Sequence, residues 1–156
     1  LQNGDFEDVV EPSPAAPAAA GHPGVPDQWV CEAPESVKVF EDGAASGRRF
    51  VRVADSRIFQ KVNQPAEFRG VLRIGAKARG HGALTVAMYR YERDTGKNLP
   101  TVVLKTFPLE AAEWSGVEAA YACADDAVLR LAFHADGRLD LDDVTVTRPA
   151  AGCPAP

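Results

Sequence analysis

Acidic residues gather at the two ends of this 156-residue chain, which carries few other polar clusters. The stretch LQNGDFEDV opens the chain, and LDLDDVTVT, a carboxylate-rich segment within an alternating apolar run, spans residues 139–147. Paired carboxylates bind hard cations through their oxygens, or serve as the acid and the base of a glycosidase. Both kinds of chemistry need more than one carboxylate at the same place.

The period-two pattern near the C-terminal end predicts that one carboxylate is buried. Asp142 shares its side of the expected strand with Val144 and Val146, so its side chain should point inward, whereas Asp143 should point outward. A buried carboxylate without a partner costs several kcal/mol, so it requires a cation or hydrogen-bond donors. Two alternatives stay open for Asp142: a metal ion, or hydrogen bonds from the backbone or from arginine.

No motif in the sequence predicts an enzyme. G-x-S-x-G, H-E-x-x-H and glycine-rich phosphate loops are absent, and His22, His81 and His134 are far apart. Glu7 and Asp142 form the one pair that suggests a glycosidase, but both lie at expected strand edges and not in an aromatic-lined cleft. We therefore expect no catalytic residues.

A pair of tyrosines suggests a binding surface. Tyr89 and Tyr91 lie two positions apart on one strand, so they emerge on the same face about 7 Å from each other. The opposite face of that strand carries Leu84, Val86 and Met88, which we expect in the core. An aromatic platform flanked by planar polar groups is typical of sites that stack on a pyranose ring.

Polar residues on neighbouring strands are expected to complete this platform. Arg73, Arg130 and His134 all point outward by the same alternation. In a second interpretation the tyrosines only cover the sheet beneath a proline-rich loop, and the arginines are ordinary solvated charges. A third places a ligand at the loop tips RGHGA (79–83) or ERDTGKN (92–98).

Composition excludes several classes of protein. The formal charge is −5 and the pI is about 5.2, with no basic cluster that could neutralise a row of phosphates, so we expect no nucleic-acid partner. No apolar run approaches the roughly 20 residues of a membrane helix, and no charged-then-apolar leader begins the sequence. We expect a soluble domain without a membrane span, whose export signal, if it had one, lies outside this sequence.

The three cysteines leave their pairing open. Cys31, Cys123 and Cys153 are odd in number and lack the CxxC spacing of zinc or redox sites. Of the possible disulfides we favour Cys31 with Cys153, because both flank the expected strands. The alternative is three unpaired thiols, some of them buried.

The chain reads as one domain of short strands. Residues 10–28 hold five prolines and no hydrophobic period, so we expect a Pro/Ala-rich loop, and residues 149–156 read as the start of a linker after a module that spans 1–148. Only PLEAAEW (108–114) competes as a helix, and it is too short to nucleate alone. We predict an all-β antiparallel sandwich of nine or ten strands, from the segments SVKVFE, RRFVRVAD, IFQKV, GVLRIGAKA, ALTVAMYRYE, TVVLKTF, GVEAAYA, AVLRLAF and RLDLDDVTVT.

Five stretches in order resemble the galactose-binding-like jelly-roll sandwich of carbohydrate-binding modules, especially the group with families 4, 9 and 22. They are NGDFED, Trp29 after the proline-rich loop, IFQKVNQPAEFRGVLRIGAKA, EWSGVEAAYA and AVLRLAFHADGRLDLDDVTVT. Trp29 and Trp114 match structural positions of that family, so the resemblance supplies no obvious sugar-gripping tryptophan.

The resemblance also implies a structural calcium ion that joins the first and last strands. It implies Glu7 and Asp142 as side-chain ligands, with backbone carbonyls near Asp5 and around Ser46 in EDGAASG. Calcium would hold both carboxylates ionised, whereas a glycosidase needs one of them protonated.

The function expected from these observations is binding without catalysis. We predict a secreted or cell-surface, monomeric module that is tethered to further domains and targets them to a polysaccharide or glycan. The competing hypothesis is a structural or adhesion sandwich with no sugar ligand, supported by the shortage of free aromatic residues. The sequence does not specify the sugar.

Overall fold

The computed structural model describes residues 4–7 and 28–149, and within them the chain is built from β-strands. The predicted loop at 10–28 and the predicted linker therefore lie almost wholly outside the described residues. The elements are β1 (Val30–Cys31), a 3-10 turn η1 (Pro34–Ser36), β2 (Val37–Glu41), β3 (Arg49–Ala54), β4 (Arg57–Val62), β5 (Gly70–Tyr91), β6 (Asn98–Cys123) and β7 (Val128–Thr147). None of the described elements is a helix long and apolar enough to cross a membrane.

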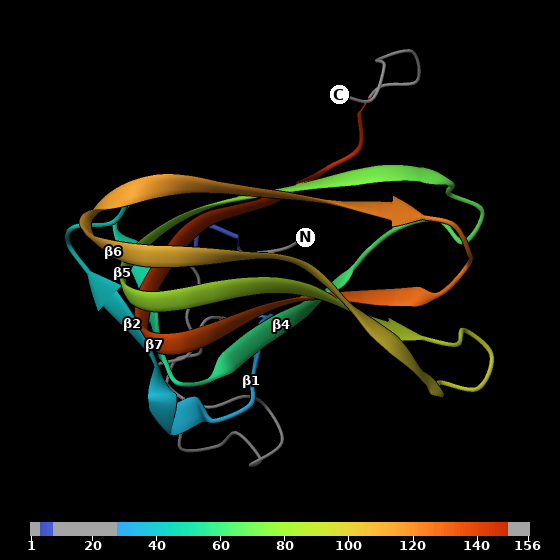
Figure 1. Cartoon of the computed structure of the whole chain (residues 1–156), viewed down its shortest axis with the longest axis horizontal. Coiled ribbons are helices and arrows are strands. Elements are labelled where there is room, and N and C mark those ends of the chain that lie inside the picture. Colours follow the sequence, from blue (N-terminus) through green and yellow to red (C-terminus); the bar gives the residue numbers. More distant parts are fainter. Residues whose placement is uncertain (1–3, 8–27, 150–156) are drawn as a thin grey trace.

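Three of the strands are unusually long, so residues 4–7 and 28–149 contain seven strands and not the predicted nine or ten. β5, β6 and β7 have 22, 26 and 20 residues, and each joins two of the predicted segments into one continuous strand. The segment PLEAAEW, the one helical competitor, is part of β6. Figure 1 shows the three strands running side by side and bending together at one end of the molecule.

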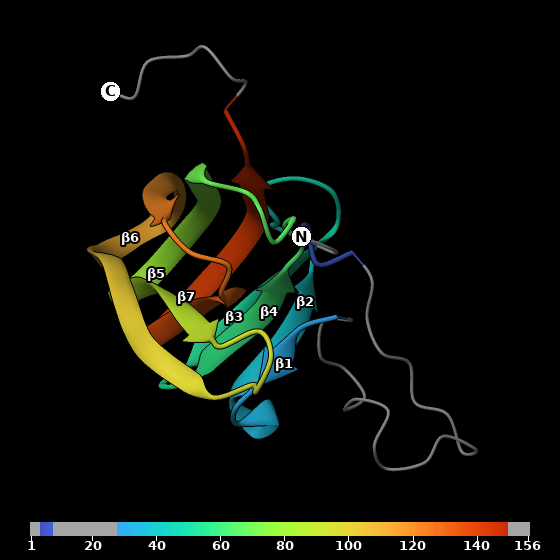
Figure 2. The same ribbon diagram turned by 90° about the vertical axis from the view of Figure 1, so that its right-hand side faces the viewer.

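The bend folds one antiparallel sheet into two layers. The first half of β7 pairs with β4 and with the second half of β5, whereas the second half of β7 pairs with β3 and with the first half of β5. We call β1-β4-β7-β5-β6 layer one and β2-β3-β7-β5-β6 layer two. Figure 2 shows the curled sheet nearly end-on.

Glycines make the bend possible. Gly80, Gly82 and Gly137 have φ of 127°, 140° and 100°, and Gly82 lies opposite Gly137 where β5 and β7 cross from one layer to the other. A Cβ on Gly82 would come 1.9 Å from the carbonyl oxygen of Asp136, so no other residue fits there. We call this place the glycine corner. It contains RGHGA, which the sequence suggested as a loop tip.

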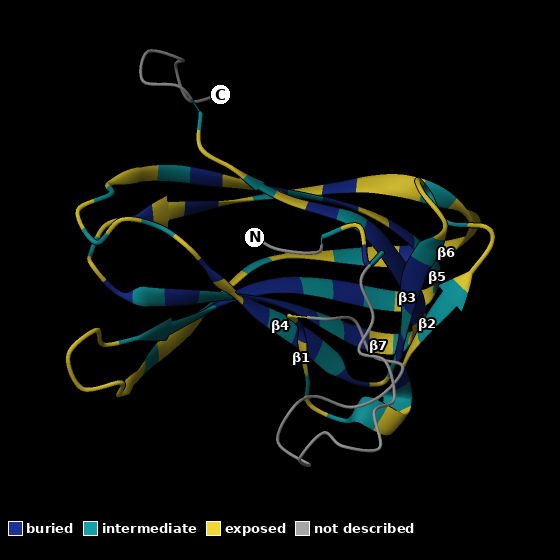
Figure 3. Ribbon diagram, turned by 180° about the vertical axis from the view of Figure 1, so that it is seen from behind, coloured by how far each residue is buried: buried dark blue, intermediate teal, exposed yellow. Residues whose placement is uncertain are grey.

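The core lies between the two layers and follows the predicted alternation (Figure 3). Phe6 and Trp29 close one side of it, with ring centroids 5.4 Å apart, which agrees with a structural role for Trp29. Phe40 and Phe59 are partly exposed on the outer faces. Leu84, Val86 and Met88, which were predicted to point inward, are buried, and so are the alternating residues of the neighbouring segments: Leu72, Ile74, Ala76, Ala78, Leu129, Leu131 and Phe133.

Two cysteines fall within the described residues. Cys31 and Cys123 form no disulfide with any described residue, and burial raises the pKa of the Cys31 thiol to about 11. Such a thiol is almost entirely protonated at neutral pH and is a poor nucleophile. The favoured partner of Cys31, Cys153, lies outside the described residues, so that pairing stays a prediction.

Candidate functional site

The outer side of layer one brings most of the predicted platform together. Register places Tyr89 opposite Arg130, and Arg57 opposite His134, and alternation turns these side chains away from the core. We call this surface the tyrosine face and define it by Glu32, Arg57, Phe59, Tyr89, Tyr91, Arg130 and His134. Four of the five predicted ligand-binding residues, Tyr89, Tyr91, Arg130 and His134, belong to it.

A chain of hydrogen bonds fixes the centre of the tyrosine face. Arg57 forms a two-bond ion pair with Glu32, and its Nη1 donates to the Tyr89 hydroxyl at 3.0 Å. The same hydroxyl lies 2.6 Å from Nε2 of His134. The hydroxyl oxygen accepts the bond from Arg57, and the direction of its hydrogen bond with Nε2 is set by the tautomer of His134.

The pKa shifts agree with this arrangement. Burial lowers the pKa of His134, and the nearby Arg57 cation lowers it further. Burial likewise raises the pKa of Tyr89, so its hydroxyl keeps its proton. The hydrogen bond from Arg57 lowers the pKa of Glu32, which stays ionised. The centre of the face therefore presents the Glu32 carboxylate, the Arg57 guanidinium and two neutral polar groups at neutral pH, and the Arg130 guanidinium lies beside them.

Aromatic rings surround this chain. Phe59 packs edge-on against Tyr89 with centroids 5.6 Å apart, and the Arg130 guanidinium lies 5.0 Å from the Tyr91 ring and 5.7 Å from the Phe59 ring. Beneath them Ala132 is fully buried, so a small residue leaves room for the rings to approach the sheet. The rings are held in place rather than free to rotate.

A groove of about 410 Å³ runs along the tyrosine face. Its lining includes Glu32, Arg57, Phe59, Tyr89 and Tyr91, and continues to Asn98 at the start of β6. Tyr89 and Tyr91 are both partly exposed within the described part of the chain. The interpretation in which the proline-rich loop covers the tyrosines concerns residues outside the described part of the chain.

Arg73 is not part of this surface. It lies in the first half of β5, where it lines a separate groove of about 460 Å³ with Glu118, Thr145 and Thr147. The glycine corner separates Arg73 from Tyr89 on the same strand, so outward parity alone could not show that the two residues belong to different layers.

The acidic residues of the two ends do lie side by side, around the loop that joins β2 to β3. The Glu7 carboxylate accepts hydrogen bonds from the backbone N–H groups of Arg48 and Arg49 at 2.7 and 2.8 Å. Oδ2 of Asp142 accepts from the N–H groups of Ala45 and Ser46 at 2.8 and 3.1 Å. We call this arrangement the terminal latch.

Two further contacts complete the latch. Oδ1 of Asp142 accepts from the N–H of Asp143 at 2.8 Å, and Ser46 Oγ bonds the Asp143 carboxylate. The N–H of Val144 donates to the carbonyl of Gly4 at 2.7 Å, which joins the two ends of the described chain directly.

Asp142 is fully buried, as predicted, but it does not point into the core. Leu139 and Leu141 occupy the core side of β7, so Asp142 faces the other way and is covered by the loop. A register shift opposite Gly75–Lys77 and a φ of 49° at Asp143 then reverse the alternation, so that Val144 is again buried. The period-two pattern does not reveal this bulge, so it wrongly predicted that Asp142 shares a side of the strand with Val144 and Val146.

The latch supplies only part of what calcium requires. Calcium takes about six to eight oxygens, whereas the described residues contain no group of three or more acidic, histidine or cysteine side chains that could hold a metal. Burial raises the pKa of Asp142, although the backbone N–H groups around it act in the opposite direction. Asp5 is exposed. The backbone alternative accounts for the contacts of Asp142, and the calcium ion stays a prediction.

Sequence reasoning missed Arg57, Glu32 and Phe59. The alternation in RIFQKV buries Ile58, Gln60 and Val62 and therefore turns Arg57 and Phe59 outward, so one signal was present. The pairing of β4 with β7, which places these side chains beside His134, is not visible in a period-two pattern.

Comparisons with known proteins support the fold. No protein-family model and no curated protein matches the chain. Among solved structures, the CBM22-2 xylan-binding domain of Xyn10C from Paenibacillus barcinonensis superposes with a TM-score of 0.63 at 15% identity, covering 80% of this chain and 93% of that one. The module TmCBM61, solved with β-1,4-galactotriose, gives 0.58 at 19% identity over 95% and 97% of the two chains.

A third structure holds such a module within a larger enzyme. The CBM22-1 and GH10 modules of Clostridium thermocellum endo-1,4-β-D-xylanase 10B, solved with xylohexaose, give a TM-score of 0.65 at 19% identity, covering 80% of this chain and 26% of that one. At identities this low, the superpositions establish a shared architecture. The chain has the β-sandwich fold of carbohydrate-binding modules, as the resemblance predicted.

Proposed function

We propose that this chain is a non-catalytic module that binds a polysaccharide or glycan on its tyrosine face. One observation carries the proposal: the rings of Tyr89, Tyr91 and Phe59 share a groove with the Arg57–Glu32 ion pair. The neighbours in fold include a xylan-binding domain and a module solved with galactotriose, which supports a glycan as the ligand class.

The groove offers the two kinds of contact that a pyranose needs. The apolar face of the sugar stacks on an aromatic ring, for which we select Tyr91, which lines the groove and lies opposite Asn98 in register. Hydroxyl groups in adjacent positions bond pairwise to planar polar groups, here the Glu32 carboxylate, the Arg57 guanidinium and the Asn98 amide.

The hydrogen-bond chain lowers the cost of binding. Arg57 is held by Glu32 and Tyr89, and Tyr89 is held by His134, so these side chains have little rotamer freedom left to lose. Ordering a free side chain costs about 0.5–1.5 kcal/mol on binding. A preorganised surface therefore retains more of the stacking energy.

No acid–base step is part of this proposal. The Glu7 and Asp142 carboxylates face backbone N–H groups in the terminal latch, whereas a glycosidase needs both carboxyl groups beside a bound sugar. We also propose that the module is exported, is monomeric and is tethered to further domains, and that a calcium ion joins the latch. The arrangement of CBM22-1 with GH10 modules in the xylanase supports the tethering.

The proposal is tested by affinity electrophoresis and calorimetry on the intact chain with xylan, galactan and cellulose. Tyr91→Ala should remove most of the binding to the preferred glycan, since stacking on one ring contributes about 1–2 kcal/mol. Arg73→Ala is the matched control, because Arg73 is exposed in a different groove. Retention of full affinity in Tyr91→Ala and in Tyr89→Ala would refute the tyrosine face, and no binding to any glycan would favour a purely structural module.

A further inference from the structure

A second polar site lies on the outer side of layer two, beyond the glycine corner from the tyrosine face. A cavity of about 580 Å³ opens there. Three guanidinium groups and one carboxylate give its lining an excess of positive charge, in contrast to the net negative charge of the chain. We call this site the arginine groove and define it by Arg52, Arg79, His81, Arg138 and Asp140.

Asp140 organises two of the arginines. Its carboxylate is 4% exposed and accepts Nε and Nη2 of Arg52 at 2.6 and 3.1 Å, and Nε of Arg79 at 2.9 Å. One buried carboxylate thus fixes two guanidinium groups in a set orientation.

Aromatic rings form the bed on which these groups lie. The Arg52 guanidinium is 4.5 Å from the Phe40 ring, and that of Arg79 is 4.4 Å from Trp114 and 4.9 Å from Phe50. Trp114 is itself held by a hydrogen bond from Nε1 to the carbonyl of Gly43 at 2.9 Å. Phe40 and Trp114 are partly exposed, so the bed is open to solvent.

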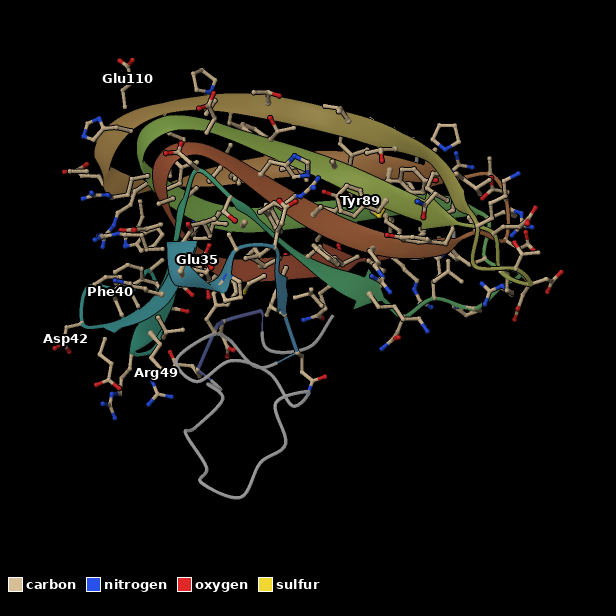
Figure 4. The ribbon with its side chains drawn as sticks, turned by 90° about the horizontal axis from the view of Figure 1, so that it is seen from below. Glu35, Phe40, Asp42, Arg49, Tyr89 and Glu110 are labelled. Carbon is tan, nitrogen blue, oxygen red and sulfur yellow. The ribbon has the colours of Figure 1, made fainter. Side chains whose placement is uncertain are left out.

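The groove retains donors that Asp140 does not use. Arg79 gives only its Nε–H to Asp140, and the exposed Arg138 forms no hydrogen bond or ion pair with any described residue. Glu110 lies opposite His81 in register, and Figure 4 shows it projecting from the edge of the molecule. The planar guanidinium group, with free N–H pairs, matches the geometry of a carboxylate.

We propose that the arginine groove binds an acidic sugar residue, a uronic acid whose carboxylate accepts hydrogen bonds from Arg138 and Arg79. This inference rests on the proposed glycan-binding function and extends it to a charged glycan. His134 on the tyrosine face and Asp140 in the groove stand on the same strand, β7, on either side of the glycine corner. A sulfate ester offers the same negative charge, and the experiment separates the two.

The experiment compares matched pairs of ligands by calorimetry on the intact chain. The pairs are glucuronoxylan with neutral xylan oligosaccharides, and oligogalacturonate with neutral galactan oligosaccharides, together with a sulfated galactan. We expect an acidic member to bind at least about tenfold more tightly than its neutral partner, or about 1.4 kcal/mol, with a preference that falls as salt rises. Tighter binding of the sulfated ligand than of either uronate would overturn the assignment to a carboxylate.

A charge-matched pair of variants assigns this preference to the groove. Arg138→Gln should abolish the preference and leave neutral-ligand binding unchanged, whereas Arg73→Gln should retain it. Equal affinities within both pairs, or equal effects of the two substitutions, would overturn the proposal. The tyrosine face is judged separately, by the effect of Tyr91→Ala on the neutral ligands, so failure of one site is distinguishable from failure of the other.

Discussion

Asp140 and Glu41 accept the same number of hydrogen bonds from arginines, but Asp140 is buried and Glu41 is exposed. Comparing the two carboxylates therefore measures how burial changes their contribution to stability. Each carboxylate accepts three hydrogen bonds from two arginines, those of Glu41 coming from Arg48 and Arg49. The side chain of Asp140 is 6% exposed and that of Glu41 is 48% exposed. Asp140→Asn and Glu41→Gln remove one charge each without changing the shape of the side chain.

The expected loss of stability in Asp140→Asn follows from the contacts that the new amide can still make with Arg52 and Arg79. The amide keeps one acceptor oxygen but turns an NH₂ group toward guanidinium donors, and breaking a buried ion pair costs about 3–5 kcal/mol. The side chains of Arg52 and Arg79 are 32% and 22% exposed, so water replaces part of the loss. We expect unfolding to become easier by about 2–3 kcal/mol, which lowers Tm by about 5–10 °C in a domain of this size.

Glu41→Gln should hardly change Tm, because water screens an exposed ion pair. Thermal unfolding followed by circular dichroism, with urea unfolding as a second measurement, compares both variants with the unmodified chain. Equal losses in the two variants, or an Asp140→Asn protein as stable as the original, would refute the reasoning that burial decides the value of these contacts.

Three further predictions concern the corner, the tyrosine face and the latch. Gly82→Ala should prevent folding because its Cβ would lie 1.9 Å from a backbone oxygen, whereas Gly96→Ala, with φ of 69° and no atom within 4 Å, should cost about 1 kcal/mol in urea unfolding. Since the folded-state pKa of His134 is lowered, its contribution to stability is complete above the ordinary value of about 6.5 and should be lost as the pH falls toward the folded-state value; His134→Gln should remove that dependence from the Tm profile. The proposed calcium ion at Glu7 and Asp142 predicts that Tm rises with the logarithm of free calcium and falls on chelation, and an unchanged Tm would leave the backbone N–H groups as the partners of these carboxylates.

Alternation in the sequence was sufficient to predict strands and faces, but not how far each strand continues. GVLRIGAKA and ALTVAMYRYE read as two strands because Gly80 and Gly82 between them resemble a turn. In the structure those glycines allow β5 to continue around a bend that side chains would block. The glycines therefore indicated correctly that the chain changes direction. The pattern could not show whether one strand ends there at a turn or continues around a bend.

The candidate site residues show the same limit, because the pattern predicts which face of a strand a residue occupies but not which layer. Strand parity and order were enough to place Tyr89, Tyr91, Arg130 and His134 on one surface. Arg73 was wrongly grouped with them, because parity says nothing about which layer a residue occupies. Asp142 was correctly expected to be buried. The left-handed backbone of Asp143 depends on how the strands pair in three dimensions, and no residue type in the segment indicates it. Contacts that depend on register between distant strands had to come from the structure.

The continuity of β7 has a mechanical consequence. Arg130 and His134 of the tyrosine face stand on the same strand that ends at Thr147, and that strand is hydrogen-bonded along both edges, to β4 and β3 on one side and to β5 on the other. A pull between a ligand held on that face and anything attached after Thr147 therefore runs lengthwise through one central strand. Such a load must shear many hydrogen bonds at once and cannot unzip them in turn, whereas a pull on residues 4–7 acts on the bonds of the latch and on the packing of Phe6 against Trp29.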